Sequence, residues 1–217
     1  MTYIVPEKVY YIHIPKSGGT SEKYKLKEMY GDDLVEVRTG KHSPYSEKYS
    51  HYDCIYTHVR NPHTRLLSIY LFHFELNFMP EKHISTERNN FLDTEHRRRI
   101  AKNSSLYWRN MSQFDKVMMH KLKQLHNNIS PDNYVKWLEL VGKANNVMDQ
   151  YFEFRPWLQQ YLWLSDNVHV KKIEEEQGEI LYKTTKMPDH NDDEYLEAGR
   201  SIIQKYYSED LRRFGYE

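Results

Sequence analysis

The sequence predicts a single α/β domain in which helices flank a central parallel sheet. Its 217 residues suffice for one domain with a buried core. In the N-terminal part, short β-rich runs alternate with stretches rich in helix formers, an order typical of parallel strands joined by helices. Polar loops follow two of these runs, at the place where such sheets bind ligands. The expected domain covers residues 1–217, with a polar insertion or loop around residues 80–110.

The N-terminal elements follow the order strand, glycine loop, helix, strand, helix. Residues 9–14 are β-branched or aromatic for the most part and end at a proline and two glycines, which predicts a buried first strand. Residues 21–29 are expected to form a helix, and residues 34–37 a short second strand. Residues 54–59 predict another central strand. A proline shortly after it favours the start of a helix that includes residues 64–71.

The C-terminal half is expected to be mostly helical. Ser112 with Asp115 resembles a helix start, and Ser130 followed by a proline begins another helix. Residues 168–173 predict a late strand. A final pair of helices is expected over residues 193–214.

Composition and charge exclude several classes of protein. The 31 basic and 31 acidic residues cancel, which argues against nucleic acid as a partner. Cys54 is the single cysteine, so no intrachain disulfide can form. The N-terminus lacks a signal pattern and the apolar runs are too short to span a bilayer. These features predict a cytoplasmic protein without a membrane span.

The run PKSGGTS at residues 15–21 predicts an anion site between a strand and a helix. Consecutive glycines let backbone N–H groups converge on an anion, and the start of the helix adds further donors. Lys16 offers a mobile positive charge, and hydroxyl donors come from Ser17, Thr20 and Ser21. The lysine precedes the glycines, unlike the order in a Walker A loop, so hydrolysis of ATP or GTP fits less well. An ordinary strand-to-helix turn is the alternative interpretation.

A second motif, VRNPHTRLLS at residues 59–68, follows the later strand. Arg60 at the end of a strand can give a bidentate fork to a phosphate. Ser68 lies about two helical turns further on and can present its hydroxyl to the same region. Taken alone, the motif also fits a capped helix with surface arginines.

Both motifs resemble those of sulfotransferases that use 3′-phosphoadenosine 5′-phosphosulfate (PAPS). Residues 15–21 resemble the 5′-phosphosulfate loop, P-K-[ST]-G-[GT]-[ST]-[ST], and residues 59–68 resemble the 3′-phosphate motif, V-R-[ND]-P-x-x-R-L-x-S. The resemblance implies that Lys16 stabilises the departing phosphate and that Arg60 and Ser68 bind the 3′-phosphate. It further implies that Arg65 braces the helix. The phosphate cradle would consist of Ser17, Gly18, Gly19, Thr20 and Ser21.

Transfer to a hydroxyl also needs a base, and histidine suits that role near neutral pH. Twelve histidines compete. His42 lies between the two motifs in a polar loop that resembles the K-H-x-x of the carbohydrate-type, family-2 branch, so the resemblance implies that His42 is the general base. His13 and His58 lie inside expected strands and are expected to be structural, while His63 is close enough to the second motif to touch a nucleotide.

Later segments extend the resemblance over nearly the whole chain. Residues 155–162 resemble the family's Q-x-x-Y-L region, and residues 206–216 resemble its Y-x-x-D-x-x-x-F-G-Y terminus. The resemblance implies a P-loop-like sulfotransferase fold without a metal. The enzyme would move a sulfonate group from PAPS to a hydroxyl acceptor, most readily a saccharide, and release adenosine 3′,5′-bisphosphate.

Other interpretations stay open at this point. One is a nucleotide kinase of the P-loop type, and another is a non-catalytic protein that binds a nucleotide or glycan. Residues 183–186 fit either a mobile lid or a polar loop. The arginine run at residues 97–99 fits either a reader of an acidic glycan or a solvated face.

Overall fold

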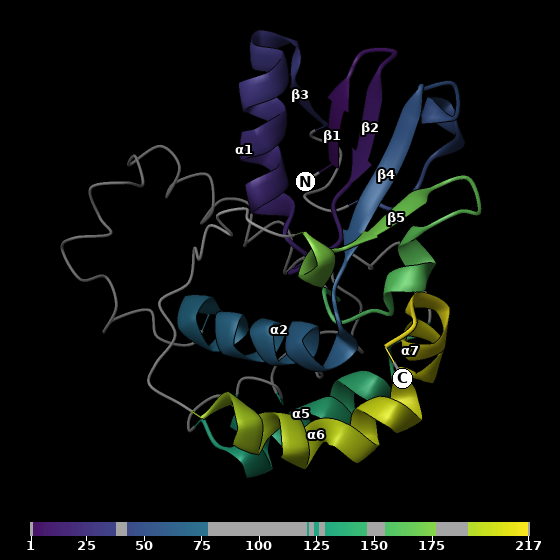
Figure 1. Ribbon diagram of the computed structural model, residues 1–217. Coiled ribbons are helices and arrows are strands. Elements are labelled where there is room, and N and C mark those ends of the chain that lie inside the picture. Colours follow the sequence, from purple (N-terminus) through teal and green to yellow (C-terminus); the bar gives the residue numbers. More distant parts are fainter. Residues whose placement is uncertain are drawn as a thin grey trace, which may run out of the picture.

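The computed structural model contains a five-stranded sheet with a layer of helices beyond one of its edges (Figure 1). It describes residues 2–37, 43–77, 121, 124–125, 129–146, 155–176 and 191–216. The strand order is β3-β1-β2-β4-β5. The strands are β1 (Thr2–Val5), β2 (Val9–Ile12), β3 (Val35–Val37), β4 (Cys54–Val59) and β5 (His169–Lys172). The strands predicted from residues 9–14, 34–37, 54–59 and 168–173 are thereby confirmed.

The sheet is mixed, so the prediction of a central parallel sheet is confirmed only in part. β2, β4 and β5 pair in parallel, whereas β1 is antiparallel to both of its neighbours, β2 and β3. β1 was not predicted. Only a tight turn joins it to β2, in which the Lys8 N–H donates to the Val5 carbonyl oxygen at 3.1 Å. Parallel pairing needs a long crossover connection, so a turn of this length dictates an antiparallel hairpin.

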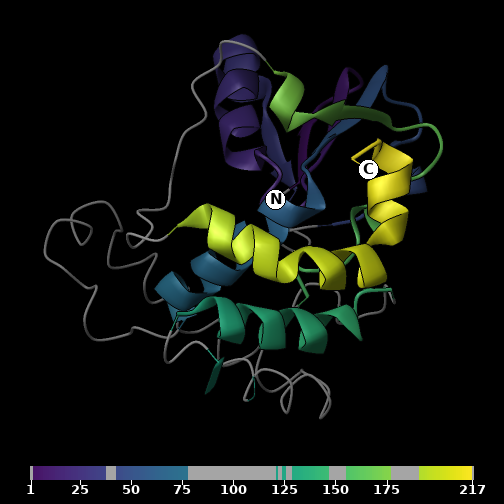
Figure 2. The same cartoon turned by 60° about the horizontal axis from the view of Figure 1, so that its bottom comes forward.

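One helix covers a face of the sheet and the others form a layer beyond its edge (Figure 1). The α-helices are α1 (Gly19–Tyr30), α2 (Pro62–Asn77), α5 (Pro131–Gly142), α6 (Asp192–Tyr206) and α7 (Ser208–Phe214). The short 3₁₀ turns are η1 (Gly31–Asp33), η2 (Glu47–Tyr49), η5 (Gln160–Trp163) and η6 (Ile173–Glu175). α1 buries Leu26 against a tyrosine-rich face of β1 and β2 that includes Tyr3 and Tyr11. The second view shows α6 running alongside α5, with which it packs (Figure 2).

The helix starts predicted at Ser130 and near Pro62 agree with the structure. Ser130 caps α5, because its Oγ accepts from the Asn133 N–H at 3.2 Å, and the proline that follows it is the first helical residue. Asn191 caps α6 by accepting from the Asp193 N–H at 3.2 Å. The Asn61 side chain accepts from the His63 N–H at 3.0 Å at the start of α2. The predicted helix start at Ser112, like the insertion at residues 80–110, lies outside the described residues.

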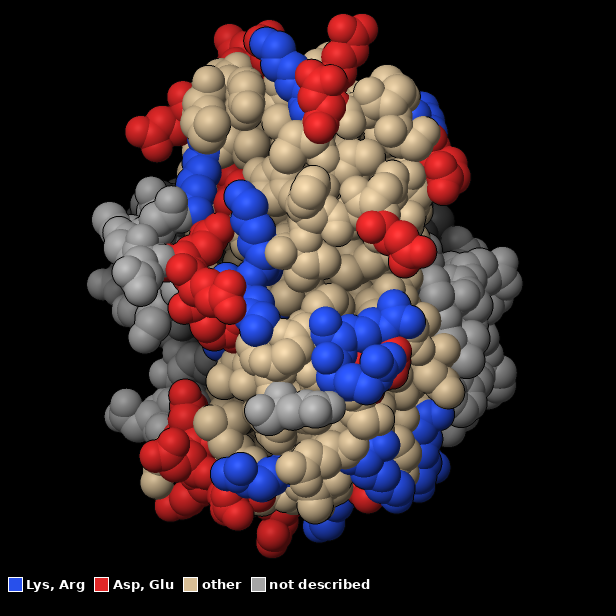
Figure 3. Space-filling view, turned by 45° about the vertical axis from the view of Figure 1, so that its right-hand side comes forward, with Lys and Arg blue, Asp and Glu red and all other residues tan. Residues whose placement is uncertain are grey.

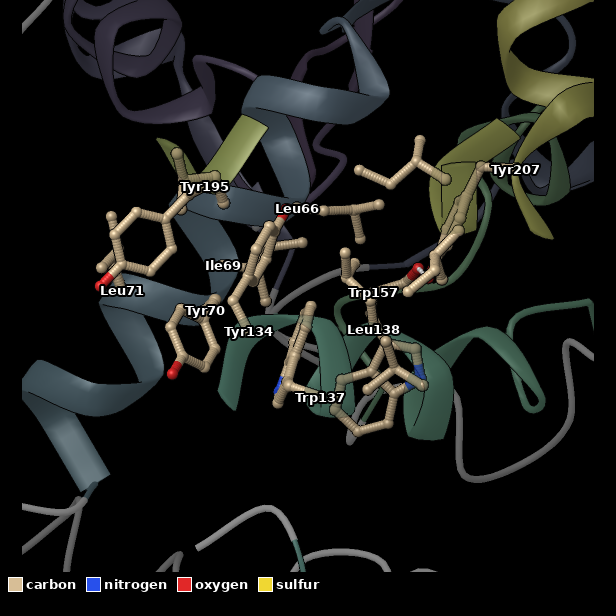
Figure 4. Close-up of a cluster of buried hydrophobic side chains, with 14 of the residues drawn as sticks. Leu66, Ile69, Tyr70, Leu71, Tyr134, Trp137, Leu138, Trp157, Tyr195 and Tyr207 are labelled. Atoms are coloured by element: carbon tan, nitrogen blue, oxygen red, sulfur yellow. Dashed lines mark hydrogen bonds between the residues drawn. The ribbon is translucent and has the colours of Figure 1, made fainter. Parts of the chain in front are cut away.

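An aromatic core holds the helical layer together (Figure 4). Tyr70 of α2, Tyr134 and Trp137 of α5 and Tyr195 of α6 meet with ring centroids 5.1–6.4 Å apart. These side chains are buried, and aromatic rings contribute large apolar areas. The layer therefore offers a rigid support for the loops between it and the sheet. Among the described residues, no helix combines the length and the apolar character needed to cross a bilayer.

Candidate functional site

The two sequence motifs leave the sheet at the same edge. β2 precedes the glycine loop, β4 precedes the second motif, and the two strands are parallel neighbours with Ile12 opposite Thr57. Carboxyl ends of neighbouring parallel strands lie side by side, so the two loops begin next to each other. The predicted coincidence of the two loops at one edge is confirmed.

The glycine loop bends sharply before α1. Lys16 and Gly18 have left-handed backbone conformations, with φ of 64° and 83°, and the Ser17 N–H donates to the Ile14 carbonyl oxygen at 3.3 Å. α1 begins at Gly19 with no side-chain cap, in contrast to α5 and α6. The first amides of an α-helix have no partner within the helix and carry a partial positive charge, which makes them a binding site for anions.

Close neighbours leave no room for a side chain at residue 18 or residue 19 of the glycine loop. A Cβ at residue 18 would lie 2.5 Å from Ile173 Cδ1, in addition to the strain of the positive φ. A Cβ at residue 19 would overlap the ring of His13. That ring is buried beside both Tyr3 and Tyr11, with centroids 6.2 and 6.3 Å away, so it has little room to move.

Gly19→Ala is expected to lower the free energy of unfolding by about 2–3 kcal/mol, because overpacking forces neighbouring atoms apart. Urea unfolding of the variant measures the change. Gly31→Ala is the comparison: residue 31 has a positive φ of 54°, which residue 19 lacks, but a Cβ there would meet nothing within 4 Å. If Gly19→Ala cost no more than the roughly 1 kcal/mol expected of the backbone change at Gly31, the close contact with His13 would be unimportant.

A buried glutamine, Gln160, joins the two motifs. The Gln160 side chain is fully buried, and its Oε1 accepts from Ser17 Oγ at 3.1 Å and from the Arg60 N–H at 2.9 Å. Its Nε2 donates to the Arg60 carbonyl oxygen at 2.8 Å. Asp210 holds this segment in turn, because its carboxylate accepts from the backbone N–H groups of Gln160 and Tyr161 at 2.7 and 3.0 Å. Burial raises the pKa of Asp210, although these hydrogen bonds oppose the shift.

Arg65 holds the start of the glycine loop in place. The side chain is fully buried and donates to three carbonyl oxygens: Nε to Pro15 at 3.0 Å, Nη1 to Leu158 at 3.0 Å and Nη2 to Pro156 at 2.7 Å. Burial lowers its pKa to about 10. The resemblance implied that Arg65 braces the helix. Its hydrogen bonds extend from α2 to the glycine loop and to the segment before η5.

Arg60 lies shortly before α2, and its guanidinium group contacts the first turn of that helix. Its Nε donates to Thr64 Oγ1 at 3.0 Å, and within the described part of the chain its terminal nitrogens have no hydrogen bond. Burial lowers the pKa of Arg60, although Glu174 and Asp192 act against the shift. A cavity of about 550 Å³ opens next to Thr64 and is lined by Asn61, His63, Thr64, Leu196, Arg200, Gln204, Ser208, Leu211 and Tyr216.

The other predicted site residues lie as follows. Ser17 is buried with its hydroxyl donating to Gln160, Thr20 is exposed in the first turn of α1, and Ser21 is buried there. Ser68 is buried on α2. The remaining candidates, His42 and the runs at residues 97–99 and 183–186, lie outside the described residues.

The described segments before and after His42 both reach the edge of the sheet from which the glycine loop starts. Val37 pairs with Thr2 at the end of β3, and the Thr2 hydroxyl donates to the Ser43 carbonyl oxygen at 3.4 Å. Thr2 is at the edge of the sheet where β2 ends, since Tyr3 is paired with Tyr11.

Neither the sequence motifs nor the resemblance identified a polar cluster beside the glycine loop. His58 Nε2 lies 2.6 Å from Glu176 Oε1, while His58 Nδ1 faces Glu22 Oε2 at 3.9 Å. Lys25 Nζ contacts both carboxylates, at 2.8 Å from Glu176 and 3.7 Å from Glu22. Glu22, His58 and Glu176 each bring one possible metal-ligand atom within 4.8 Å of the others, but the Lys25 ammonium already supplies a positive charge to both carboxylates. We therefore describe the cluster as an ion network.

The network keeps Glu176 charged at neutral pH. Burial acts to raise the pKa of Glu176, but its contacts with Lys25 and His58 outweigh burial and the pKa lies below its ordinary value. A carboxylate whose pKa is lowered by folding stabilises the fold above its ordinary pKa, and that contribution is lost only as the pH falls through the lowered value.

Charges elsewhere on the surface are mixed. On the face in Figure 3, basic side chains occur in small groups next to acidic ones around a broad uncharged area. Arg212 and Arg213 both contact Glu209, and Lys172 contacts Glu175. The described residues of this face form no continuous basic strip of the kind that follows a nucleic-acid backbone.

No family model, curated protein or solved structure matches the chain.

Proposed function

We propose that the chain is a sulfotransferase of the carbohydrate-type branch, with the P-loop-like fold of that family. It would move a sulfonate group from PAPS to a hydroxyl acceptor, with a saccharide as the favoured class. The observation that carries the proposal is the uncapped start of α1 within the glycine loop, held beside Arg60 through Gln160. Two anion sites at a fixed spacing suit a donor with phosphate groups at two positions.

Each predicted residue then has a defined task. The amides of Gly18, Gly19, Thr20 and Ser21 would hold the 5′-phosphate, and Lys16 would stabilise the negative charge that develops on it as the sulfur–oxygen bond breaks. Ser17, whose hydroxyl donates to Gln160, supports the loop and offers its backbone to the cradle. Arg60 and Ser68 would hold the 3′-phosphate.

The acceptor would approach in line with the breaking bond. Its oxygen forms the new bond to sulfur while the bond to the phosphate oxygen breaks, and adenosine 3′,5′-bisphosphate leaves with the electron pair. His42 would take the proton from the acceptor hydroxyl. The described residues on either side of His42, Val37 and Ser43, lie at the edge from which the glycine loop starts, which supports this role.

The proposal predicts that the protein prefers adenosine 3′,5′-bisphosphate both to ATP and to AMP, which lacks the 3′-phosphate. Calorimetric titration with the three nucleotides measures the preference. Arg60→Ala should weaken binding of the bisphosphate about 10- to 100-fold, because a charge-assisted hydrogen bond is lost, and leave binding of AMP nearly unchanged.

Arg212→Ala is the matched control, since Arg212 is exposed and contacts Glu209 on the surface. Binding of ATP but not of the bisphosphate would contradict the proposal and favour a kinase. Tight binding of the bisphosphate with no transfer in a screen of saccharide, phenol and alcohol acceptors would favour a non-catalytic binding protein.

A further inference from the structure

Four residues that follow β5 touch both halves of the candidate site. We call residues 173–176 the strap; they comprise η6 and Glu176. At one end Ile173 Cδ1 lies against Gly18, where a side chain at residue 18 would otherwise be. In the middle, Glu174 Oε1 accepts from the Asn61 N–H at 2.7 Å, and its Oε2 accepts from the Tyr216 hydroxyl at 2.7 Å. The strap thus connects the glycine loop with the start of α2.

The far end of the strap is held by the ion network. Glu176 Oε1 contacts His58 Nε2 at 2.6 Å and Glu176 Oε2 contacts Lys25 Nζ at 2.8 Å. His58 is almost entirely buried and belongs to β4, two residues before Arg60, while Lys25 belongs to α1. Glu174 is exposed, so its two hydrogen bonds are open to competition from water, whereas the contact between His58 and Glu176 is shielded.

We propose that His58 is a positioning residue, which acts through Glu176 to hold the strap across the glycine loop and the second motif. The strap is a further connection between the two motifs, on the side of α1, in addition to Gln160 and the hydrogen bond from Arg65 to Pro15. With all three in place, the glycine loop cannot move away from Arg60 without breaking a buried contact. The consequence for nucleotide binding rests on the proposed function, but the mechanical role of His58 does not.

Removal of the imidazole should release the strap without unfolding the chain. In His58→Ala, hydrogen exchange at the Asn61 amide, which the strap covers through Glu174, should become at least about tenfold faster than in the native protein. The affinity for adenosine 3′,5′-bisphosphate should fall about tenfold, the effect expected when one hydrogen bond to a charged group is lost.

His58→Gln should restore both properties to within about threefold of the native values, since the glutamine amide can donate to Glu176 at the position of His58 Nε2. His169→Ala is the matched control, because His169 is an exposed histidine of β5. A second variant, Glu176→Ala, removes the carboxylate that both His58 and Lys25 contact and leaves the buried imidazole of β4 intact. It keeps the test available if His58→Ala does not fold.

Each outcome decides one point. If His58→Ala, or Glu176→Ala in its place, is folded and shows native exchange at the Asn61 amide, the positioning role is wrong. Faster exchange together with rescue by His58→Gln supports it. If the native protein does not bind the bisphosphate, the proposed function fails, and the exchange measurement still tests the strap.

Discussion

Arg65→Ala is expected to lower the free energy of unfolding by about 3–5 kcal/mol, the largest effect on stability of any single substitution in the site. The side chain donates to three carbonyl oxygens while fully buried. Removing it leaves those oxygens without donors in a place that water reaches poorly. An unmet buried acceptor costs more than an ordinary hydrogen bond contributes.

Chemical denaturation with urea measures the change in unfolding free energy. Arg65→Lys should recover only part of the loss, because one ammonium group cannot reach three acceptors arranged for a planar fork. Arg212→Ala serves as the exposed control and should change stability by no more than about 1 kcal/mol. A native-like unfolding curve for Arg65→Ala would mean that the three hydrogen bonds do not hold the glycine loop.

Lys16→Ala should reduce turnover at least about 100-fold, as expected when a group that stabilises charge in the transition state is removed. The left-handed backbone at residue 16 costs an alanine about as much as a lysine, so the loop should keep its shape. Binding of adenosine 3′,5′-bisphosphate should therefore weaken much less than turnover. Release of this product from PAPS, with a panel of saccharide acceptors, gives the rate.

His42→Ala provides the comparison for the other half of the chemistry. It should lower turnover and largely keep donor binding, because the base would act on the acceptor and not on the nucleotide. Lys27→Ala on the exposed side of α1 is the control for loss of a lysine. Near-normal turnover of Lys16→Ala would contradict the role of Lys16, and near-normal turnover of His42→Ala with the true acceptor would contradict that of His42.

Local sequence patterns predicted most elements of the fold but not the full sheet. Strands β2 to β5 were predicted because β-rich residues end at glycine, proline or polar loops, and α5 was predicted from Ser130 and the proline after it. β1 lies close to the chain start and gave too short a pattern to recognise. Without β1, the rhythm of alternating strands and helices indicated parallel strands only.

The placement of the two loops of the candidate site was predictable because the residues of each loop are neighbours in the sequence. The glycine loop and the start of α2 each lie within one short motif, and parallel strands place both at one edge. Gln160, Glu174 and Glu176 were not identified, because each acts on residues far away in the chain. A buried glutamine looks like any other glutamine in a sequence, and a run of acidic residues does not show which carboxylate is paired.

Gln160 connects the two motifs through neutral groups, so this connection and the binding of a donor should respond differently to ionic strength. Its partners are a hydroxyl and the backbone of residue 60, so dissolved salt hardly weakens it. Attraction between Lys16, Arg60 and the phosphates of a donor would weaken steadily as ions screen the charges. A loss of affinity in concentrated salt would therefore measure the electrostatic part of binding, while the frame that spaces the two anion sites stays unchanged.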